Sequence, residues 1–191
     1  MAYLFAILGG LLLSLHSGAA ETTTAQWPPA AAEAEQLFTA DGYRQARYRA
    51  PTPEQTDGAV TLETSELQQL LAGANPPLLL DVRPLSWKAG RFIKQKDYQQ
   101  LPGSLWLPNV GYGEPEPAWL DYFQRNLQRL RTEQPARALV FYCRADCWMS
   151  WNAARRAHQW GYGNLYWYRD GIDGWREAEL PLTSVEPVPY P

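Results

Sequence analysis

The sequence predicts an α/β fold in which a parallel β-sheet lies between helices. Residues 78–80 and 138–142 are short apolar runs, and such runs are typical of central parallel strands, which are buried on both faces. Between them, residues 119–132 carry apolar side chains on one face of a helix that would cover the sheet. Their spacings are three, four and three: Leu120, Phe123, Leu127 and Leu130. Because strands alternate with helices, the strands are expected to be parallel.

The other elements have local reasons of their own. Thr64 or Ser65 can cap a helix that runs to Leu71 after a short strand at Val60–Leu62, and Pro135 stops the later helix. The remaining elements follow in chain order: a loop at 84–98 anchored by Trp87 and Phe92, a short strand within 101–108, a loop at 111–117, a helix at Trp148–Trp160, a strand at Asn164–Tyr168 and a helix start within 169–175.

Composition divides the chain into segments. They are a signal peptide (1–20), a tether and N-terminal extension (21–58), one α/β domain (59–182) and a proline-rich tail (183–191). The first segment joins an apolar core to the small residues Gly18 and Ala20, a pattern typical of secretory signals, so we expect a periplasmic protein without a membrane anchor after cleavage. An uncleaved anchor is the alternative, although the apolar run Ala2–Leu15 is short for a bilayer span.

Charge and cysteine content limit the kinds of site. The formal net charge is −3, and nothing strongly basic invites nucleic acid. The chain has two cysteines, Cys143 and Cys147, which in an oxidising compartment are expected to form a disulfide much of the time. Only His158 of the two histidines lies outside the signal segment, so we expect neither a metal site nor a bound cofactor.

The chemistry is expected at the turn between the strand at 138–142 and the helix that follows it. Such a turn leaves backbone N–H groups unpaired, and these stabilise negative charge. We therefore expect Cys143 to be a nucleophilic thiolate and Cys147 its resolving thiol, since cysteines four residues apart across a tight turn can reach disulfide distance. Arg144 is the expected electrostatic helper, whereas Asp146 opposes ionisation unless it caps the helix.

Two charged residues are expected at the same sheet edge as the cysteines. Asp81 and Arg83 follow a predicted central strand, and parallel strands place their carboxyl ends at one edge. Direct chemistry is one interpretation. In the preferred alternative, Asp81 holds loops through backbone N–H groups and Arg83 pairs with a carboxylate. Three arginines of the extension are expected either to bind an acidic group or, preferably, to form a solvated face: Arg44, Arg47 and Arg49.

Several stretches resemble, in order and spacing, the successive segments of a rhodanese domain over residues 60–182. The stretches are VTLETSELQQLL, LLLDVR, LPGSLWLP, VFYC with its turn and helix, and GYGNLYWYRDGIDGWREAELPL. More narrowly, CRADCWMSWNAARRA and the extension GYRQARYRAP resemble exported rhodanese-like proteins associated with pyrroloquinoline quinone-dependent alcohol catabolism. That family is described by a CXXCW motif, whereas this chain has three residues between its cysteines.

The resemblance implies a single rhodanese-like domain and a sulfurtransferase cysteine at Cys143, which would accept sulfur as a persulfide. The loop departs from active members, because Trp148 stands where an arginine is typical. Met149 stands where a rhodanese-like phosphatase needs its arginine, which excludes that activity. Trp148, Met149, Asp146 and the pair Asp81 and Arg83 are expected to bind substrate or support the loop. Covalent haem attachment is excluded, since no Cys-x-x-Cys-His sequence is present.

Two functional hypotheses remain open. In the first, Cys143 and Cys147 carry out thiol–disulfide redox chemistry or sulfane-sulfur transfer. In the second, the disulfide is structural, and the domain is a binding module for an exported pyrroloquinoline quinone-dependent dehydrogenase, a cytochrome or a transport component. Trp148 and Trp151, with Trp87, would form an aromatic rim at the site, unless these side chains belong to the core.

Overall fold

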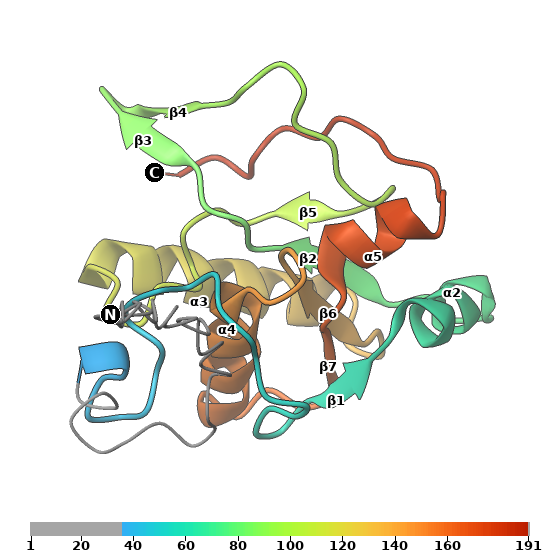
Figure 1. The fold of residues 1–191 in the computed structure, drawn as a ribbon, viewed down its shortest axis with the longest axis horizontal. Coiled ribbons are helices and arrows are strands. Elements are labelled where there is room, and N and C mark those ends of the chain that lie inside the picture. Colours follow the sequence, from blue (N-terminus) through green and yellow to red (C-terminus); the bar gives the residue numbers. More distant parts are fainter. Residues whose placement is uncertain (1–35, 191) are drawn as a thin grey trace, which may run out of the picture.

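Five parallel strands form the centre of the domain in this computed structural model, which describes residues 36–190 (Figure 1). Their spatial order is β1-β7-β6-β2-β5. In chain order they are β1 (Val60–Leu62), β2 (Leu78–Asp81), β5 (Leu105–Trp106), β6 (Leu139–Tyr142) and β7 (Leu165–Tyr168). The predicted α/β fold with a central parallel sheet is confirmed. The predicted signal peptide and the tether before residue 36 lie outside the described residues.

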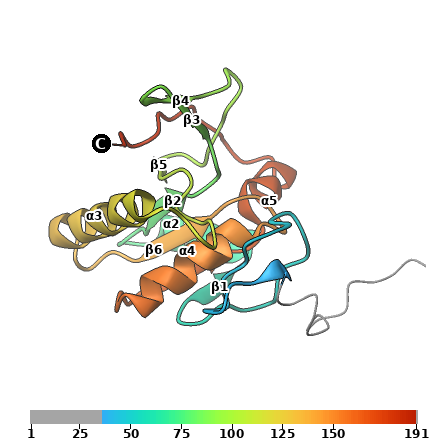
Figure 2. The same cartoon turned by 90° about the vertical axis from the view of Figure 1, so that its left-hand side faces the viewer.

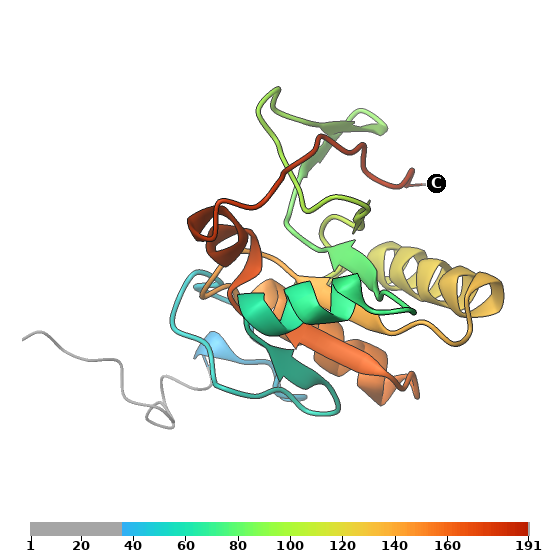
Figure 3. The ribbon, with the colours of Figure 1, turned by 90° about the vertical axis from the view of Figure 1, so that its right-hand side faces the viewer.

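Helices cover both faces of the sheet, as Figures 1 and 3 show from two sides. They are α2 (Thr64–Ala72), α3 (Pro117–Glu133), α4 (Trp148–Gln159) and α5 (Gly171–Glu177). Neighbouring residues of one strand point to opposite faces. Thus Phe141 packs with α3 and α4, while Val140 and Tyr142 pack with α2 and α5. Among residues 36–190, no helix combines the length and apolar character needed to cross a bilayer.

The segment predicted to be a loop at 84–98 instead contains an antiparallel hairpin. Its strands are β3 (Ser86–Lys88) and β4 (Arg91–Ile93). Three-residue strands with polar outer positions leave almost no periodic signal, which is why the loop prediction was wrong here. The anchoring role of Trp87 and Phe92 is confirmed, because their ring centroids lie 4.7 Å apart and both rings also pack near Trp119. Figure 2 shows the hairpin standing away from the main sheet.

The tail after α5 returns along the domain. Thr183 exchanges backbone hydrogen bonds with Gln100, and the Val188 N–H donates to Trp106 O at 2.8 Å. Tyr190 then reaches the aromatic cluster of the hairpin, 4.0 Å from Trp119 between ring centroids. The tail therefore follows the β5 edge of the sheet.

Raising the pH above the ordinary pKa of tyrosine is expected to destabilise the fold through Tyr168. Burial raises the pKa of this phenol from 10.0 to about 12, and its oxygen lies 2.8 Å from Thr64 Oγ1. The unfolded chain releases this proton at a lower pH than the folded protein, so the stabilisation is complete below pH 10 and is lost as the pH rises toward 12. The loss from this side chain is about 2 kcal/mol. Urea unfolding at several alkaline pH values measures it. Tyr168→Phe should flatten the dependence, and an unchanged slope would contradict the assignment.

Candidate functional site

The two cysteines lie at opposite ends of one turn and are joined by a disulfide. Cys143 directly follows β6, Cys147 directly precedes α4, and their Cα atoms are 6.1 Å apart. This separation is ordinary for a disulfide, so the predicted proximity is confirmed. Cys147 is the N-cap residue of α4. Because the field of a helix N-terminus favours a thiolate, it acts first on Cys147, whereas the sequence pattern predicts this effect at Cys143.

The backbone amides of the turn are partly engaged elsewhere. The Ala145 N–H donates to Asp173 Oδ2 at 3.2 Å, and the Trp148 N–H donates to Tyr48 O at 2.9 Å. Two of the N–H groups that were expected to stabilise charge on Cys143 therefore bond to other acceptors, which corrects that expectation for Ala145 and Trp148. The competing acceptors come from α5 and from the N-terminal extension, which no local pattern in the turn reveals.

A short segment of the extension, Tyr48–Thr52, crosses the turn, and we call it the strap. Its Ala50 N–H donates to Asp146 O at 3.2 Å, and its Thr52 N–H donates to Asp146 Oδ1 at 3.3 Å. The Ala50 bond and the Trp148 N–H bond to Tyr48 O flank an antiparallel bridge in which Arg49 opposes Cys147. Asp146 thus acts as an acceptor for the strap, and the N-cap position of α4 is held by Cys147 instead.

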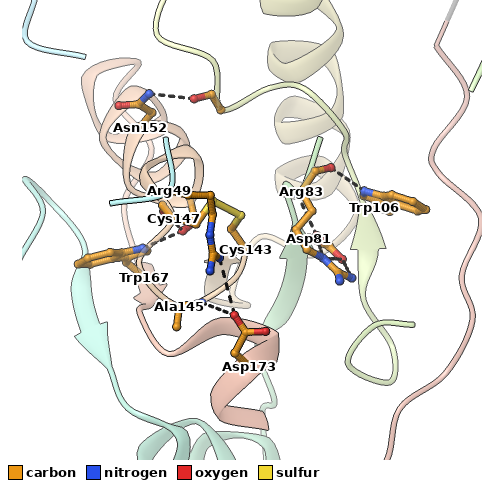
Figure 4. The surroundings of a disulfide bond; sticks show 12 residues. Arg49, Asp81, Arg83, Trp106, Cys143, Ala145, Cys147, Asn152, Trp167 and Asp173 are labelled. Carbon is orange, nitrogen blue, oxygen red and sulfur yellow. Dashed lines mark hydrogen bonds and ion pairs between the residues drawn. A yellow bond between two sulfur atoms is a disulfide. The ribbon is translucent and has the colours of Figure 1, made fainter. Parts of the chain in front are cut away.

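Helix α5 approaches the turn from another side. The Ile172 N–H donates to Cys143 O at 3.0 Å, and Gly171 opposes Arg144 in a second antiparallel bridge. A Cβ atom on Gly171 would lie 2.6 Å from Cys143 O, and its φ of +58° is in the left-handed region, so glycine is required here. Asp173 of the same helix faces Arg49, with a nitrogen–oxygen separation of 3.7 Å (Figure 4).

Both sulfurs are covered in this arrangement. Cys143 is 1% exposed and Cys147 is 4% exposed. Attack on a disulfide needs a nucleophile to reach a sulfur atom, so any reaction of this pair first requires the covering segments to move. The strap is one of those segments, because its residue Arg49 lies directly opposite Cys147.

Asp81 and Arg83 form a buried ion pair beside this edge of the sheet. Arg83 Nε lies 3.0 Å from both carboxylate oxygens, and the carboxylate also accepts the Arg83 backbone N–H. Burial acts to lower the pKa of Arg83, but the charge and hydrogen bonds of Asp81 together raise it above its ordinary value. Arg83 also donates to Gln99 O and stacks 4.4 Å from the Tyr98 ring. Both groups therefore support loops, in agreement with the preferred structural alternative.

The other predicted residues separate into exposed and buried groups. Arg144 and Asp146 are exposed on the turn, whereas Trp148 and Met149 are buried beneath it. Trp148 packs against Phe38 of the extension and against Trp151. The structure thus places Trp148 and Met149 as loop support. It does not assemble the predicted aromatic rim, because Trp87 belongs to the hairpin cluster.

The arginines of the extension do not form one solvated face. Arg44 is buried, with its guanidinium carbon 4.9 Å from the Trp148 ring centroid, and it donates to two carbonyl groups of the extension. Arg49 keeps a largely exposed side chain. Sequence reasoning also missed Asn152 and Asp173, whose roles depend on segments distant in the chain. Within residues 36–190, no three His, Cys, Asp or Glu side chains gather in a way that could hold a metal ion.

Comparison with known proteins identifies a family for this chain. The sequence profile of the rhodanese-like domain matches residues 63–178. A search of curated proteins finds no match. Among solved structures, the chain is similar to a thiosulfate sulfurtransferase from Pseudomonas aeruginosa, with 17% identity and a TM-score of 0.49, covering 68% of this chain and 21% of that one.

Two other similar structures have comparable scores. The polysulfide-sulfur transferase from Wolinella succinogenes has 15% identity and a TM-score of 0.40, with 69% of this chain and 82% of that chain covered. The anaerobic ergothioneine biosynthesis enzyme from Chlorobium limicola has 21% identity and a TM-score of 0.44, with 68% and 29% covered. The chain thus spans only about a fifth of the Pseudomonas enzyme. On the profile match, which includes the strand, turn and helix that carry both cysteines, the chain belongs to the rhodanese-like domain family.

Proposed function

We propose that the domain carries out reversible thiol–disulfide exchange through Cys143 and Cys147. The observation that carries this proposal is the bond between their sulfurs across a turn whose far end is a helix N-terminus. A disulfide at such a position has a leaving thiolate that the helix stabilises, which favours reduction by other thiols.

The exchange can be written in two balanced steps. A thiolate of a dithiol partner attacks the Cys143 sulfur, the Cys143–Cys147 bond breaks, and Cys147 leaves as a thiolate. In the mixed disulfide, the first sulfur of the partner is bonded to Cys143. The second thiolate of the partner then attacks that first sulfur, and Cys143 leaves as a thiolate. Two electrons pass from the partner, which becomes a disulfide, to the cysteine pair.

Sulfane-sulfur transfer is the second reaction that this site supports, in its reduced form. Membership of the rhodanese-like family and the place of Cys143 directly after β6 favour it. The Cys143 thiolate would attack a sulfane-sulfur donor, take its outer sulfur as a persulfide and release the remainder of the donor. Mass spectrometry after incubation with a donor should then find one additional sulfur atom on Cys143 and none in Cys143→Ser.

The alternative from a different class is a binding module with a structural disulfide. The burial of both sulfurs favours it. In that case the domain docks on a partner with the disulfide intact, and both serine variants still bind. We further propose a periplasmic location and an accessory role in pyrroloquinoline quinone-dependent alcohol oxidation, with an exported dehydrogenase, cytochrome or transport component as partner. The apolar segment at residues 1–20 and the stretch CRADCWMSW support these two proposals.

Reduction is expected to leave the domain folded but less stable. The cysteines are separated by only 4 positions. Closing so short a loop contributes about 2 kcal/mol by the chain-entropy estimate. Urea unfolding with and without a dithiol reductant measures the difference. An unchanged free energy of unfolding after reduction would contradict this expectation.

Redox titration of the full chain tests the exchange itself. Equilibration with glutathione buffers, followed by mass spectrometry of trapped thiols, should give a midpoint within the range of exchanging proteins, about −120 to −270 mV. Cys143→Ser should abolish exchange, and reduced Cys147→Ser should accumulate a mixed disulfide on Cys143. A midpoint below about −300 mV would instead favour the structural disulfide.

A further inference from the structure

The strap places a positive charge directly opposite the helix-capping cysteine. Arg49 and Cys147 oppose one another in the antiparallel bridge, and the two backbone hydrogen bonds between strap and turn lie on either side of this pair. Residues in that relation have Cα atoms about 4.5 Å apart and side chains on one face. The Arg49 side chain therefore starts beside that of Cys147, and Figure 4 shows it extending past the disulfide toward Asp173.

We propose that Arg49 is the counter-ion of the Cys147 thiolate, an inference that rests on the exchange proposed above. When an incoming thiolate attacks the Cys143 sulfur, the electron pair of the broken bond moves to Cys147. That negative charge develops at the N-cap of α4, on the residue that Arg49 opposes in the bridge. A cation within a few ångströms stabilises a thiolate and lowers the pKa of its thiol.

The present partner of Arg49 holds it only loosely. The guanidinium is 3.7 Å from Asp173 Oδ2, and the two side chains are 55% and 31% exposed. Exposed ion pairs of this kind contribute little free energy. A short movement from the carboxylate to a newly formed thiolate therefore costs little, and Asp173 remains bound to the Ala145 N–H in either case.

The other charged groups around Cys147 are less well placed for this role. Arg144 opposes Gly171 in the bridge to α5, so its backbone does not face a cysteine. Asp146 and Asp173 are negative and oppose a thiolate. Arg44 is buried over the Trp148 ring and donates to two carbonyl groups of the extension. Among the described residues, Arg49 is thus the cation that the backbone pairing presents directly to the site.

The test measures the pKa of Cys147 in the full chain carrying Cys143→Ser, through the ultraviolet absorbance of the thiolate as a function of pH. Arg49→Met should raise the Cys147 pKa by about one unit, a tenfold loss of thiolate below that pKa. Arg49→Lys keeps the charge and should restore most of the shift, and Arg144→Met is the matched control with a smaller effect. Asp173→Asn should lower the pKa, because it removes the competing carboxylate but keeps an acceptor for Ala145.

The outcomes separate this proposal from the proposed function. An unchanged Cys147 pKa in Arg49→Met, with native circular dichroism, would overturn the role of Arg49 even if the wild-type pair exchanges normally. A shifted pKa together with an inert wild-type disulfide would support Arg49 and refute exchange. If Arg49→Met does not fold, the Asp173→Asn variant decides, because a raised Cys147 pKa there contradicts the model of a competing ion pair. In the wild-type background, a tenfold change in the exchange constant corresponds to about 30 mV in the midpoint.

Discussion

Asp81→Ala is expected to destabilise the domain by about 3–5 kcal/mol, the cost of leaving one charge of a buried pair without its partner. Asp81 is 0% exposed and Arg83 is 2% exposed, so water cannot replace the lost carboxylate without opening the loop. The carboxylate also accepts the Arg83 backbone N–H at 2.9 Å, which would lose its acceptor as well. Urea unfolding followed by tryptophan fluorescence measures the change.

A surface ion pair supplies the control for Asp81. Arg129 and Glu133 lie one turn apart on α3 with both side chains about half exposed, at 45% and 51%. Glu133→Ala should cost no more than about 0.5 kcal/mol. A loss at Asp81 as small as this would mean that Arg83 finds another acceptor or solvent, and that the pair does not fix the loop after β2.

Asn152→Ala is expected to cost about 3–4 kcal/mol, because one buried amide joins α4 to two distant segments. The Asn152 side chain accepts the Arg44 N–H at 2.9 Å and donates to the carbonyl groups of Arg44 and Gly111, each at 2.8 Å. Asn152 is completely buried, so the backbone groups that it satisfies would be left without partners. The extension should also loosen, and proteolysis near residue 44 should accelerate.

The matched control for Asn152 is another buried asparagine on a helix. Asn126 donates within α3, to Tyr122 O one turn earlier. Asn126→Ala removes this hydrogen bond from the Tyr122 carbonyl group, which also accepts a backbone hydrogen bond within the helix. The substitution should therefore cost about 1 kcal/mol or less. Equal losses at the two positions would show that the contact with the extension contributes nothing beyond a local hydrogen bond.

The main sheet could be predicted because its strands are encoded locally. Apolar runs at Leu78–Asp81 and Leu139–Tyr142, and the helix between them, carry their own periodic signals. The hairpin at Ser86–Lys88 and Arg91–Ile93 could not be predicted in the same way, because its strands are short and rely on aromatic packing with Trp119.

The site was predictable only in part, for a related reason. The position of both cysteines on one turn follows from four residues of spacing between a strand and a helix. The contacts that decide their environment join residues far apart in the chain, such as Arg49 with Cys147 and Asp173 with Ala145. Arg44 and Arg49 illustrate the limit: one segment carries both, yet one is buried against Trp148 and the other lies over the turn.

The position of the strap in the chain bears on how the surroundings of the disulfide can change without a change in the fold. It precedes residues 63–178, the part of the chain that the family profile recognises. Tyr48 and Ala50 pack against the hydrophobic core, whereas Arg49 is largely exposed, so a substitution of Arg49 changes the surroundings of the disulfide with the least effect on that packing. At this one position the charge beside the sulfurs can vary while the sheet and its covering helices stay unchanged.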